Sequence, residues 1–193
     1  MSLIIGIKKD GAFYLGADTQ TTNGDLIERD FSKEGFKIKD AGNGLLFCAV
    51  GACDVSRNII VRDELFVLPE DGLTKRFIVE NFVPKVFELI KEEGLVSEIK
   101  EGKPNIDCTF ALVYKDKCFI IKNDLSVWEV DEMFAIGSGK PMAFAFLQLS
   151  DDKQDVKKTI IDAMKASAES VTSVSAPYIL RSSNNPEYEI IEG

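Results

Sequence analysis

Two apolar strand–turn–strand patterns follow each other near the start of the chain, and this order constrains the fold more than any other feature of the sequence. Residues 3–8 and 12–17 lie on either side of a Lys-Asp-Gly turn, and residues 36–39 and 44–50 repeat the arrangement around a glycine-containing turn. An Asp-Gly pair between two apolar runs is a strong hairpin signal. This part of the chain therefore predicts two hairpins and a mainly antiparallel sheet.

The middle of the chain predicts helices followed by further strands. A helical stripe of apolar residues covers residues 74–93, where Pro84 should bend or interrupt the helix. A shorter helix is expected at about 53–66, and residues 101–105 are expected to form a loop. Strand-like apolar runs then return at 108–114, 118–122, 126–130 and 133–137.

Two helices and a final strand are expected in the last part of the chain. Pro141 suits the first turn of a helix that runs to about Leu149, and an acidic stretch suits the start of a second helix over about 153–171. Residues 187–191 are expected to add a strand. Strands and helices thus occur in blocks without βαβ units, which indicates an α+β domain. We expect a single domain over 1–193, folded as a four-layer αββα sandwich of two mainly antiparallel sheets.

The composition restricts the partners that such a domain can bind. The formal net charge is -9, and the 23 Lys and Arg are scattered among 32 Asp and Glu, so the basic stripe that nucleic acid requires is absent. The longest apolar run, residues 45–50, is far shorter than the roughly 20 residues of a membrane span, and the first residues lack a secretory signal. We expect a cytoplasmic protein that binds peptides, proteins or small molecules.

The sequence contains no histidine, and this absence removes many catalytic mechanisms. Ser-His-Asp and Cys-His hydrolases, histidine general bases and most zinc sites are excluded. The four cysteines, Cys48, Cys53, Cys108 and Cys118, lie in apolar contexts without CxxC spacing and are expected to be buried free thiols. No cofactor or metal is expected, and any hydrolase built on this chain must activate its nucleophile in another way.

A carboxylate ends one of the apolar strands, where an unpaired charge is expensive to bury. Asp18 follows residues 12–17 directly, and it reads either as a turn residue or as half of a buried ion pair. Lys37 is our proposed partner, although it also reads as a solvent-facing lysine in an alternating strand. Lys33 competes with it but precedes a Glu-Gly pair and lies outside the apolar strand.

Residues 135–141 contain a glycine turn that opens a helix. A phosphate-binding Walker A loop would need a glycine at Phe134 and a hydroxyl residue at Pro141, so that interpretation fails. Ser138 in this turn reads either as a local structural residue or as the support of a site, and the two interpretations stay open.

Three blocks of the chain resemble one family. The start, SLIIGIKKDGAFYLGADTQTTNG, is similar to the start of mature proteasome β-subunits and of the peptidase of the bacterial two-component ATP-dependent protease, where a nucleophilic threonine opens the chain. FKIKDAGNGLLFCAVGACD resembles the family's lysine strand and glycine turn, and FAIGSGKPMA its serine turn and following helix. The resemblance covers about residues 2–175 and implies the N-terminal nucleophile hydrolase fold.

The resemblance also implies site residues. The family's nucleophile, aspartate, lysine, oxyanion-hole glycine and supporting serine correspond in order to Ser2, Asp18, Lys37, Gly51 and Ser138. The family's later aspartate and serine match less well here. Their nearest candidates are Glu169 and Ser173.

The chemistry of such a site can be argued from the residues themselves. An N-terminal serine supplies both nucleophile and base, because its α-amino group has an ordinary pKa of about 7.7 to 8.0 and is partly neutral at pH 7. A lysine ammonium beside it favours the free amine, and a buried carboxylate holds that lysine in place. A glycine such as Gly51 can aim its N–H at an oxyanion, although it reads equally well as a turn that needs positive φ.

Two interpretations of Ser2 stay open. Met1 precedes it, and methionine is commonly trimmed before a small residue, which would expose the serine that here replaces the family's usual threonine. Alternatively, the Met-Ser-Leu start and the Glu-Gly end come from an expression vector, and Ser2 is then not native.

The leading functional hypothesis is an N-terminal nucleophile peptidase that cleaves peptide or amide bonds through an acyl-enzyme. The resemblance implies a homo-oligomeric ring that acts on peptides or unfolded proteins, with an ATP-dependent unfoldase as its partner. The alternatives are a catalytically inactive proteasome-like assembly or scaffold protein and an amidase of small molecules. Replacing Lys37 with Ala is expected to abolish hydrolysis while the protein stays folded.

Overall fold

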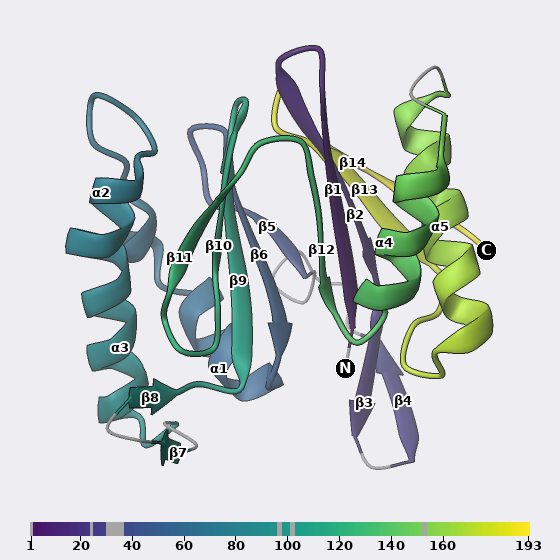
Figure 1. Cartoon of the computed structure of the whole chain (residues 1–193). Helices are drawn as coiled ribbons and strands as arrows, with labels where there is room; N and C mark the ends of the chain where they lie inside the picture. The colour runs from purple at the N-terminus through teal and green to yellow at the C-terminus, as the bar shows by residue number, and fades with distance from the viewer. Residues whose placement is uncertain (1, 24, 30–36, 96–97, 101–102, 152–153) are drawn as a thin grey trace.

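Two five-stranded antiparallel sheets stack face to face, and helices cover the outer face of each sheet (Figure 1). The computed structural model describes residues 2–23, 25–29, 37–95, 98–100, 103–151 and 154–193. The predicted four-layer αββα sandwich is confirmed.

The first sheet contains the start and the end of the chain. Its strands lie in the order β12, β1, β2, β13, β14, and their bounds are β1 (Leu3–Lys9), β2 (Ala12–Asp18), β12 (Met133–Gly137), β13 (Tyr178–Ser182) and β14 (Asn185–Ile191). The first predicted hairpin is confirmed, with Ile4 opposite Ala17. β14 contains the expected final strand, whereas β13, which pairs with β2, was not predicted.

The second sheet is built from the middle of the chain. Its strands lie in the order β11, β10, β9, β6, β5, and their bounds are β5 (Ile38–Asp40), β6 (Leu45–Gly51), β9 (Cys108–Tyr114), β10 (Lys117–Ile121) and β11 (Val127–Val130). The second predicted hairpin is confirmed in β5 and β6. Phe36, the expected first residue of that hairpin, lies outside the described residues.

Two small hairpins lie outside the main sheets. β3 (Gln20–Asn23) pairs with β4 (Leu26–Arg29), and this hairpin projects beyond one end of the sandwich (Figure 1). β7 (Glu98–Lys100) pairs with β8 (Lys103–Asn105). The expectation of a loop over 101–105 is therefore wrong for β8, where Pro104 is accommodated because a two-stranded hairpin has free edges.

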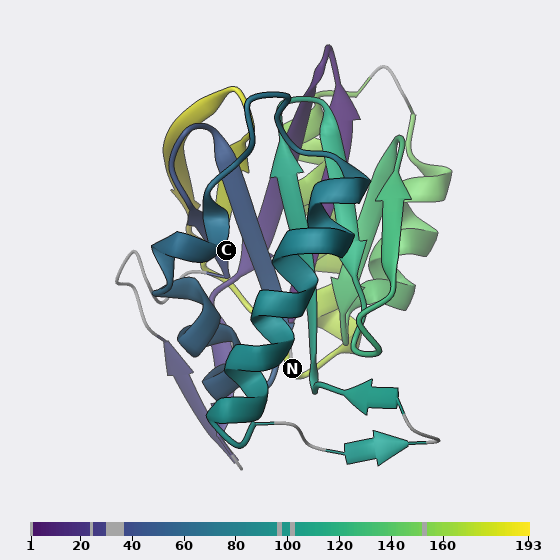
Figure 2. The ribbon, with the colours of Figure 1, turned by 90° about the vertical axis from the view of Figure 1, so that its left-hand side faces the viewer.

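Helices form the two outer layers. α1 (Cys53–Ile60), a 3-10 helix (Asp63–Phe66), α2 (Lys75–Phe77), a π-helix (Ile78–Phe82) and α3 (Val83–Glu92) precede the strands that complete the second sheet. Figure 2 shows α3 lying across the outer face of that sheet. α4 (Lys140–Leu149) and α5 (Val156–Ser170) cover the first sheet. Among the described residues, no helix is long and apolar enough to cross a membrane.

The break expected at Pro84 takes the form of a π-turn. The N–H of Val83 bonds to the carbonyl of Ile78, five residues back, directly before the proline. Pro84 has no N–H to continue the ladder and sits in the first turn of α3, where no such donor is needed.

Three apolar layers hold the four structural layers together. β6 is buried on both faces, which is why its sequence reads as a continuous apolar run without alternation. Leu45, Phe47 and Ala49 contact the layer under α1 and α3. Leu46, Cys48 and Val50 face the first sheet instead. β6 thus links the layer under the helices to the layer between the two sheets.

Candidate active site

An ion pair joins the two sheets at one end of the sandwich. Asp18 ends β2 in the first sheet, and Lys37 directly precedes β5 at the edge of the second. Lys37 Nζ lies 2.8 Å from Asp18 Oδ1; the Asp18 side chain is fully buried and the Lys37 side chain is 11% exposed. Of the two predicted lysines, Lys37 is the one brought to Asp18, while Lys33 lies outside the described residues.

Backbone donors complete the shell of the Asp18 carboxylate. The N–H of Leu3 donates to Oδ1 at 2.7 Å, and the N–H of Gln20 donates to Oδ2 at 3.1 Å. Burial, the largest effect, raises the pKa of Asp18 above its ordinary value, whereas Lys37 and the two N–H groups act to lower it. The charge on this carboxylate therefore depends on its donors, and above all on Lys37.

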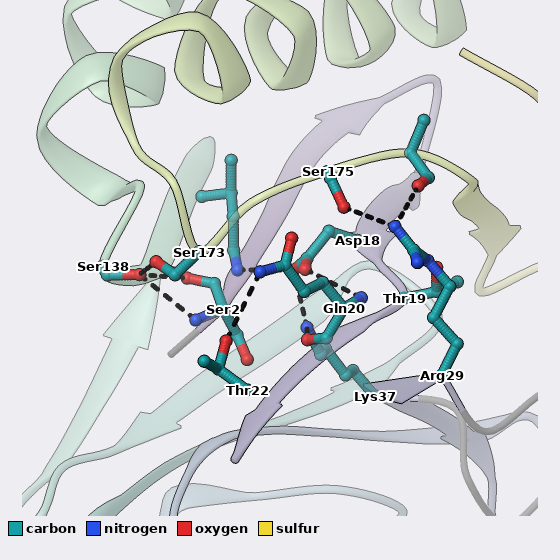
Figure 3. Close-up of polar contacts among 12 residues, drawn as sticks. Ser2, Asp18, Thr19, Gln20, Thr22, Arg29, Lys37, Ser138, Ser173 and Ser175 are labelled. Carbon is teal, nitrogen blue, oxygen red and sulfur yellow. Dashed lines mark hydrogen bonds and ion pairs between the residues drawn. The ribbon is translucent and has the colours of Figure 1, made fainter. Parts of the chain in front are cut away.

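Three serines from distant parts of the chain, Ser2, Ser138 and Ser173, meet in one group (Figure 3). The backbone N–H of Ser2 donates to Ser138 Oγ at 3.2 Å, and the Ser138 hydroxyl lies 3.2 Å from the Ser2 carbonyl oxygen. Ser138 Oγ is also 2.8 Å from Ser173 Oγ. Ser2 itself is buried. The predicted Ser2, Ser138 and Ser173 thus form one hydrogen-bonded group.

Gly137 allows the serine turn to approach the start of the chain. It pairs with Leu3 and has a φ of 100°. A Cβ at this position would lie 2.1 Å from the Ser2 carbonyl oxygen. Only glycine fits both the conformation and the close contact.

Gly51 lines the same cleft as Ser2 and Ser138. It ends β6 with a φ of 125°, and a Cβ there would lie 2.0 Å from the Asp107 carbonyl oxygen. Ser2, Gly51 and Ser138 all line this cleft, which has a volume of about 600 Å³. A carbonyl group placed in the cleft can therefore share it with Ser2 and with the Gly51 backbone.

Glu169 stands apart from the other predicted site residues. It is exposed near the end of α5, and no hydrogen bond or ion pair joins it to the site residues that the structure describes. The sequence reasoning also missed a member of the group. Gln20 contacts both Asp18 and Lys37, but nothing in its Thr- and Asn-rich stretch distinguished it from its polar neighbours.

The described residues offer no obvious metal site. Within them, no three or more His, Cys, Asp or Glu side chains gather in a metal-binding group. Cys48, Cys108 and Cys118 are buried free thiols, as predicted, and the side chain of Cys53 lies outside the described part.

Comparison with known proteins supports the fold assignment. No protein-family model matches the sequence, and no curated protein sequence matches it significantly. Solved structures do match. BPH from Thiobacillus denitrificans is 18% identical, with a TM-score of 0.73 over 96% of this chain and 100% of BPH. HslV from Trypanosoma brucei is 16% identical, with a TM-score of 0.63 over 93% of this chain and 98% of HslV. Anbu from Yersinia bercovieri, described as an ancestral beta-subunit, is 13% identical, with a TM-score of 0.70 over 98% of this chain and 87% of Anbu.

These likenesses define a class of protein by its fold. The chain has the N-terminal nucleophile hydrolase fold, and its structural neighbours are proteasome β-like proteins. The fold that the sequence resemblance implied is therefore confirmed.

Proposed function

We propose that this chain is an N-terminal nucleophile hydrolase that cleaves peptide bonds through an acyl-enzyme, with Ser2 as its nucleophile once Met1 is removed. One observation carries the proposal: Asp18 Oδ1 pairs with the Lys37 ammonium at 2.8 Å and accepts a hydrogen bond from the N–H of Leu3 at 2.7 Å. The carboxylate thus holds a cation one residue from Ser2. A buried, charged pair is costly to maintain, and such arrangements are concentrated at functional sites.

In the proposed first step, Ser2 Oγ attacks the carbonyl carbon of the substrate while the free α-amine of Ser2 takes the hydroxyl proton. The resulting oxyanion accepts a hydrogen bond from the Gly51 N–H. The C–N bond then breaks, and the leaving amine takes the proton from the α-ammonium. Water, deprotonated by the same amine, hydrolyses the ester and regenerates Ser2.

Lys37 acts in this scheme through its charge. A neighbouring cation disfavours protonation of the α-amine, so more of that amine is neutral and able to accept a proton at pH 7. Ser138 and Ser173 hold the backbone of Ser2 in place, because the Ser138 hydroxyl contacts both the nitrogen and the carbonyl oxygen of Ser2.

The proposed substrates are peptides or unfolded proteins. The cleft beside Ser2 is open and has room for a side chain next to the cleaved bond, with an apolar wall that includes Val50, Ile120 and Ile136. BPH has been solved in complex with epoxomicin, which supports a related ligand chemistry here. The similarity to HslV and to Anbu, described as a beta-subunit, supports assembly into a homo-oligomeric ring that works with an unfoldase.

The test requires protein whose free Ser2 has been verified by intact mass. Peptide hydrolysis and labelling of residue 2 by a peptide epoxyketone are measured for the parent protein and for Ser2→Ala, Lys37→Met and Lys39→Met. Lys39 is the matched control, since it lies two residues from Lys37, is similarly buried, and bonds to Ile60 and Asp63 away from the site. Ser2→Ala and Lys37→Met are expected to lose at least about 100-fold in kcat, whereas Lys39→Met keeps its activity.

Inactivity of the parent protein with free Ser2 towards peptides, small amides and the epoxyketone would contradict the hydrolase. The fold would then serve assembly or scaffolding, and native mass spectrometry would report whether the chain forms rings. Cleavage of small amides alone would instead favour the amidase.

A further inference from the structure

Gln20 is a buried polar residue beside the Asp18–Lys37 pair. It is the first residue of β3 and is 1% exposed. Its backbone contacts both members of the ion pair: the N–H donates to Asp18 Oδ2 at 3.1 Å, and the carbonyl accepts from Lys37 Nζ at 2.6 Å. Any displacement of Gln20 therefore displaces the donors and acceptors of the pair.

The side chain of Gln20 extends from the ion pair to another part of the site. Nε2 donates to the Thr172 carbonyl at 3.1 Å and to Thr22 Oγ1 at 3.4 Å. Oε1 is buried, and among the described residues it has no hydrogen-bond partner. A buried acceptor without a partner is unfavourable. An apolar side chain of this shape would avoid that cost, so the feature that an amide adds at this position is its donor to Thr172.

Thr172 directly precedes a member of the serine group. Ser173 Oγ lies 2.8 Å from Ser138 Oγ, and Ser138 contacts the backbone of Ser2. Figure 3 shows Gln20 between the ion pair and these serines. The Gln20 side chain thus joins the start of β3, which contacts the ion pair, to the segment after α5 that carries Ser173.

We propose that Gln20 is a positioning residue, which fixes the segment carrying Ser173 relative to the Asp18–Lys37 pair and so holds Ser2 in its reactive position. The proposal rests on the hydrolase function proposed above. Gln20 acts through Thr172, Ser173 and Ser138 and takes no part in bond making or breaking.

Thr19 provides a matched control on the adjacent position. It is also buried, and its hydroxyl donates to the Pro177 carbonyl at 2.9 Å. Pro177 and Thr172 both belong to the segment between α5 and β13. Within the described part of the chain, no hydrogen bond of its side chain joins it to Asp18, Lys37 or the serines. Thr19→Val and Gln20→Leu therefore each remove one side-chain bond to this segment, but only Gln20→Leu removes the bond beside Ser173.

The experiment compares Gln20→Leu, Gln20→Glu and Thr19→Val in the full chain with free Ser2. Gln20→Glu keeps the shape but, when ionised, offers no donor to Thr172. Both Gln20 variants are expected to lose about 10- to 100-fold in kcat, with KM within about twofold, because a small misplacement of reacting groups costs that much. The acid limb of their pH profile for kcat/KM is also expected to move, since the surroundings of the Ser2 amine change. Thr19→Val keeps the kcat and pH profile of the parent.

Hydrogen–deuterium exchange supplies a readout independent of activity. Exchange of the peptide containing residues 171–175 is expected to rise in Gln20→Leu and to stay unchanged in Thr19→Val. Unchanged exchange in Gln20→Leu would overturn the inference whether or not the protein is active. Faster exchange in Gln20→Leu together with a kcat equal to that of the parent would also overturn the inference. Inactivity of the parent protein would instead overturn the hydrolase on which the inference rests.

Discussion

Replacing Lys37 with Met should destabilise the protein strongly, because it leaves a fully buried carboxylate without its cation. The Asp18 side chain is 0% exposed, and its remaining partners are the backbone N–H groups of Leu3 and Gln20. Removing one partner of a buried ion pair costs about 3 to 5 kcal/mol. For a chain of this size, 1 kcal/mol corresponds to about 2 to 4 °C in Tm, so we expect Tm to fall by roughly 6 to 20 °C.

Thermal unfolding of Lys37→Met, Lys39→Met, Asp18→Asn and the Asp18→Asn/Lys37→Met double variant measures this cost. Lys39→Met should lose only about 1 kcal/mol, since its partner Asp63 is 88% exposed and stays hydrated. The loss of unfolding free energy in the double variant should be smaller than the sum of the losses in the two single variants by about 1 to 3 kcal/mol, because the double variant removes both charges together.

The pH dependence of Lys37→Met gives a second check with a defined sign. Burial raises the pKa of Asp18, and Lys37 opposes that rise, so the variant's folded state should hold a proton at pH values where the unfolded chain has lost it. The variant therefore gains stability relative to the parent as the pH falls towards the unfolded pKa of about 3.9. We expect the Tm difference to narrow between pH 8 and pH 5. Two results would refute the reasoning: a stability loss in Lys37→Met no larger than that in Lys39→Met, or a Tm difference between Lys37→Met and the parent that widens as the pH falls.

Two further predictions concern the backbone and the thiols. Gly137→Ala should lower the free energy of unfolding in urea by at least about 2 kcal/mol, since the added Cβ would lie 2.1 Å from the Ser2 carbonyl oxygen and φ is positive. Gly11→Ala, at a position with positive φ but open space, should lower it by only about 1 kcal/mol. Equal losses in the two variants would contradict the steric argument. Burial raises the pKa of Cys48 to about 12 and that of Cys118 well above its ordinary value. Neither should be alkylated by iodoacetamide at pH 8 in the folded protein, as peptide mapping would show, and rapid labelling would contradict their burial.

The sequence predicted those strands whose apolar runs are long or joined by a recognisable turn. β1 and β2 were found through their Asp-Gly turn, and β9 and β10 through their apolar runs. β13 was missed, although it is buried between β2 and β14. Its five residues follow a Ser- and Pro-containing stretch, and a short apolar run without alternation does not reveal its partner strands.

The hairpin of β3 and β4 was missed for a different reason. Its residues are polar or exposed, so they show no alternation that would indicate a buried face. Gln20 was overlooked with it, because its burial results from where the chain turns after Asp18 and not from the character of its neighbours. The predicted Asp18–Lys37 pair was brought together, since a carboxylate at the end of a buried strand requires a partner within reach.

The fold is shared with solved structures at 13 to 18% identity, which is possible because a fold depends more on backbone geometry and core volume than on particular side chains. Asp18 is placed by the end of β2 and Lys37 by the start of β5, and these strands lie in two sheets whose apolar residues can be exchanged if volume is kept. Gly51 and Gly137 supply backbone conformations. Many core and surface positions can therefore change while the backbone of the two sheets is kept. Sequence matching loses the relationship under these conditions, whereas comparison of the backbones retains it.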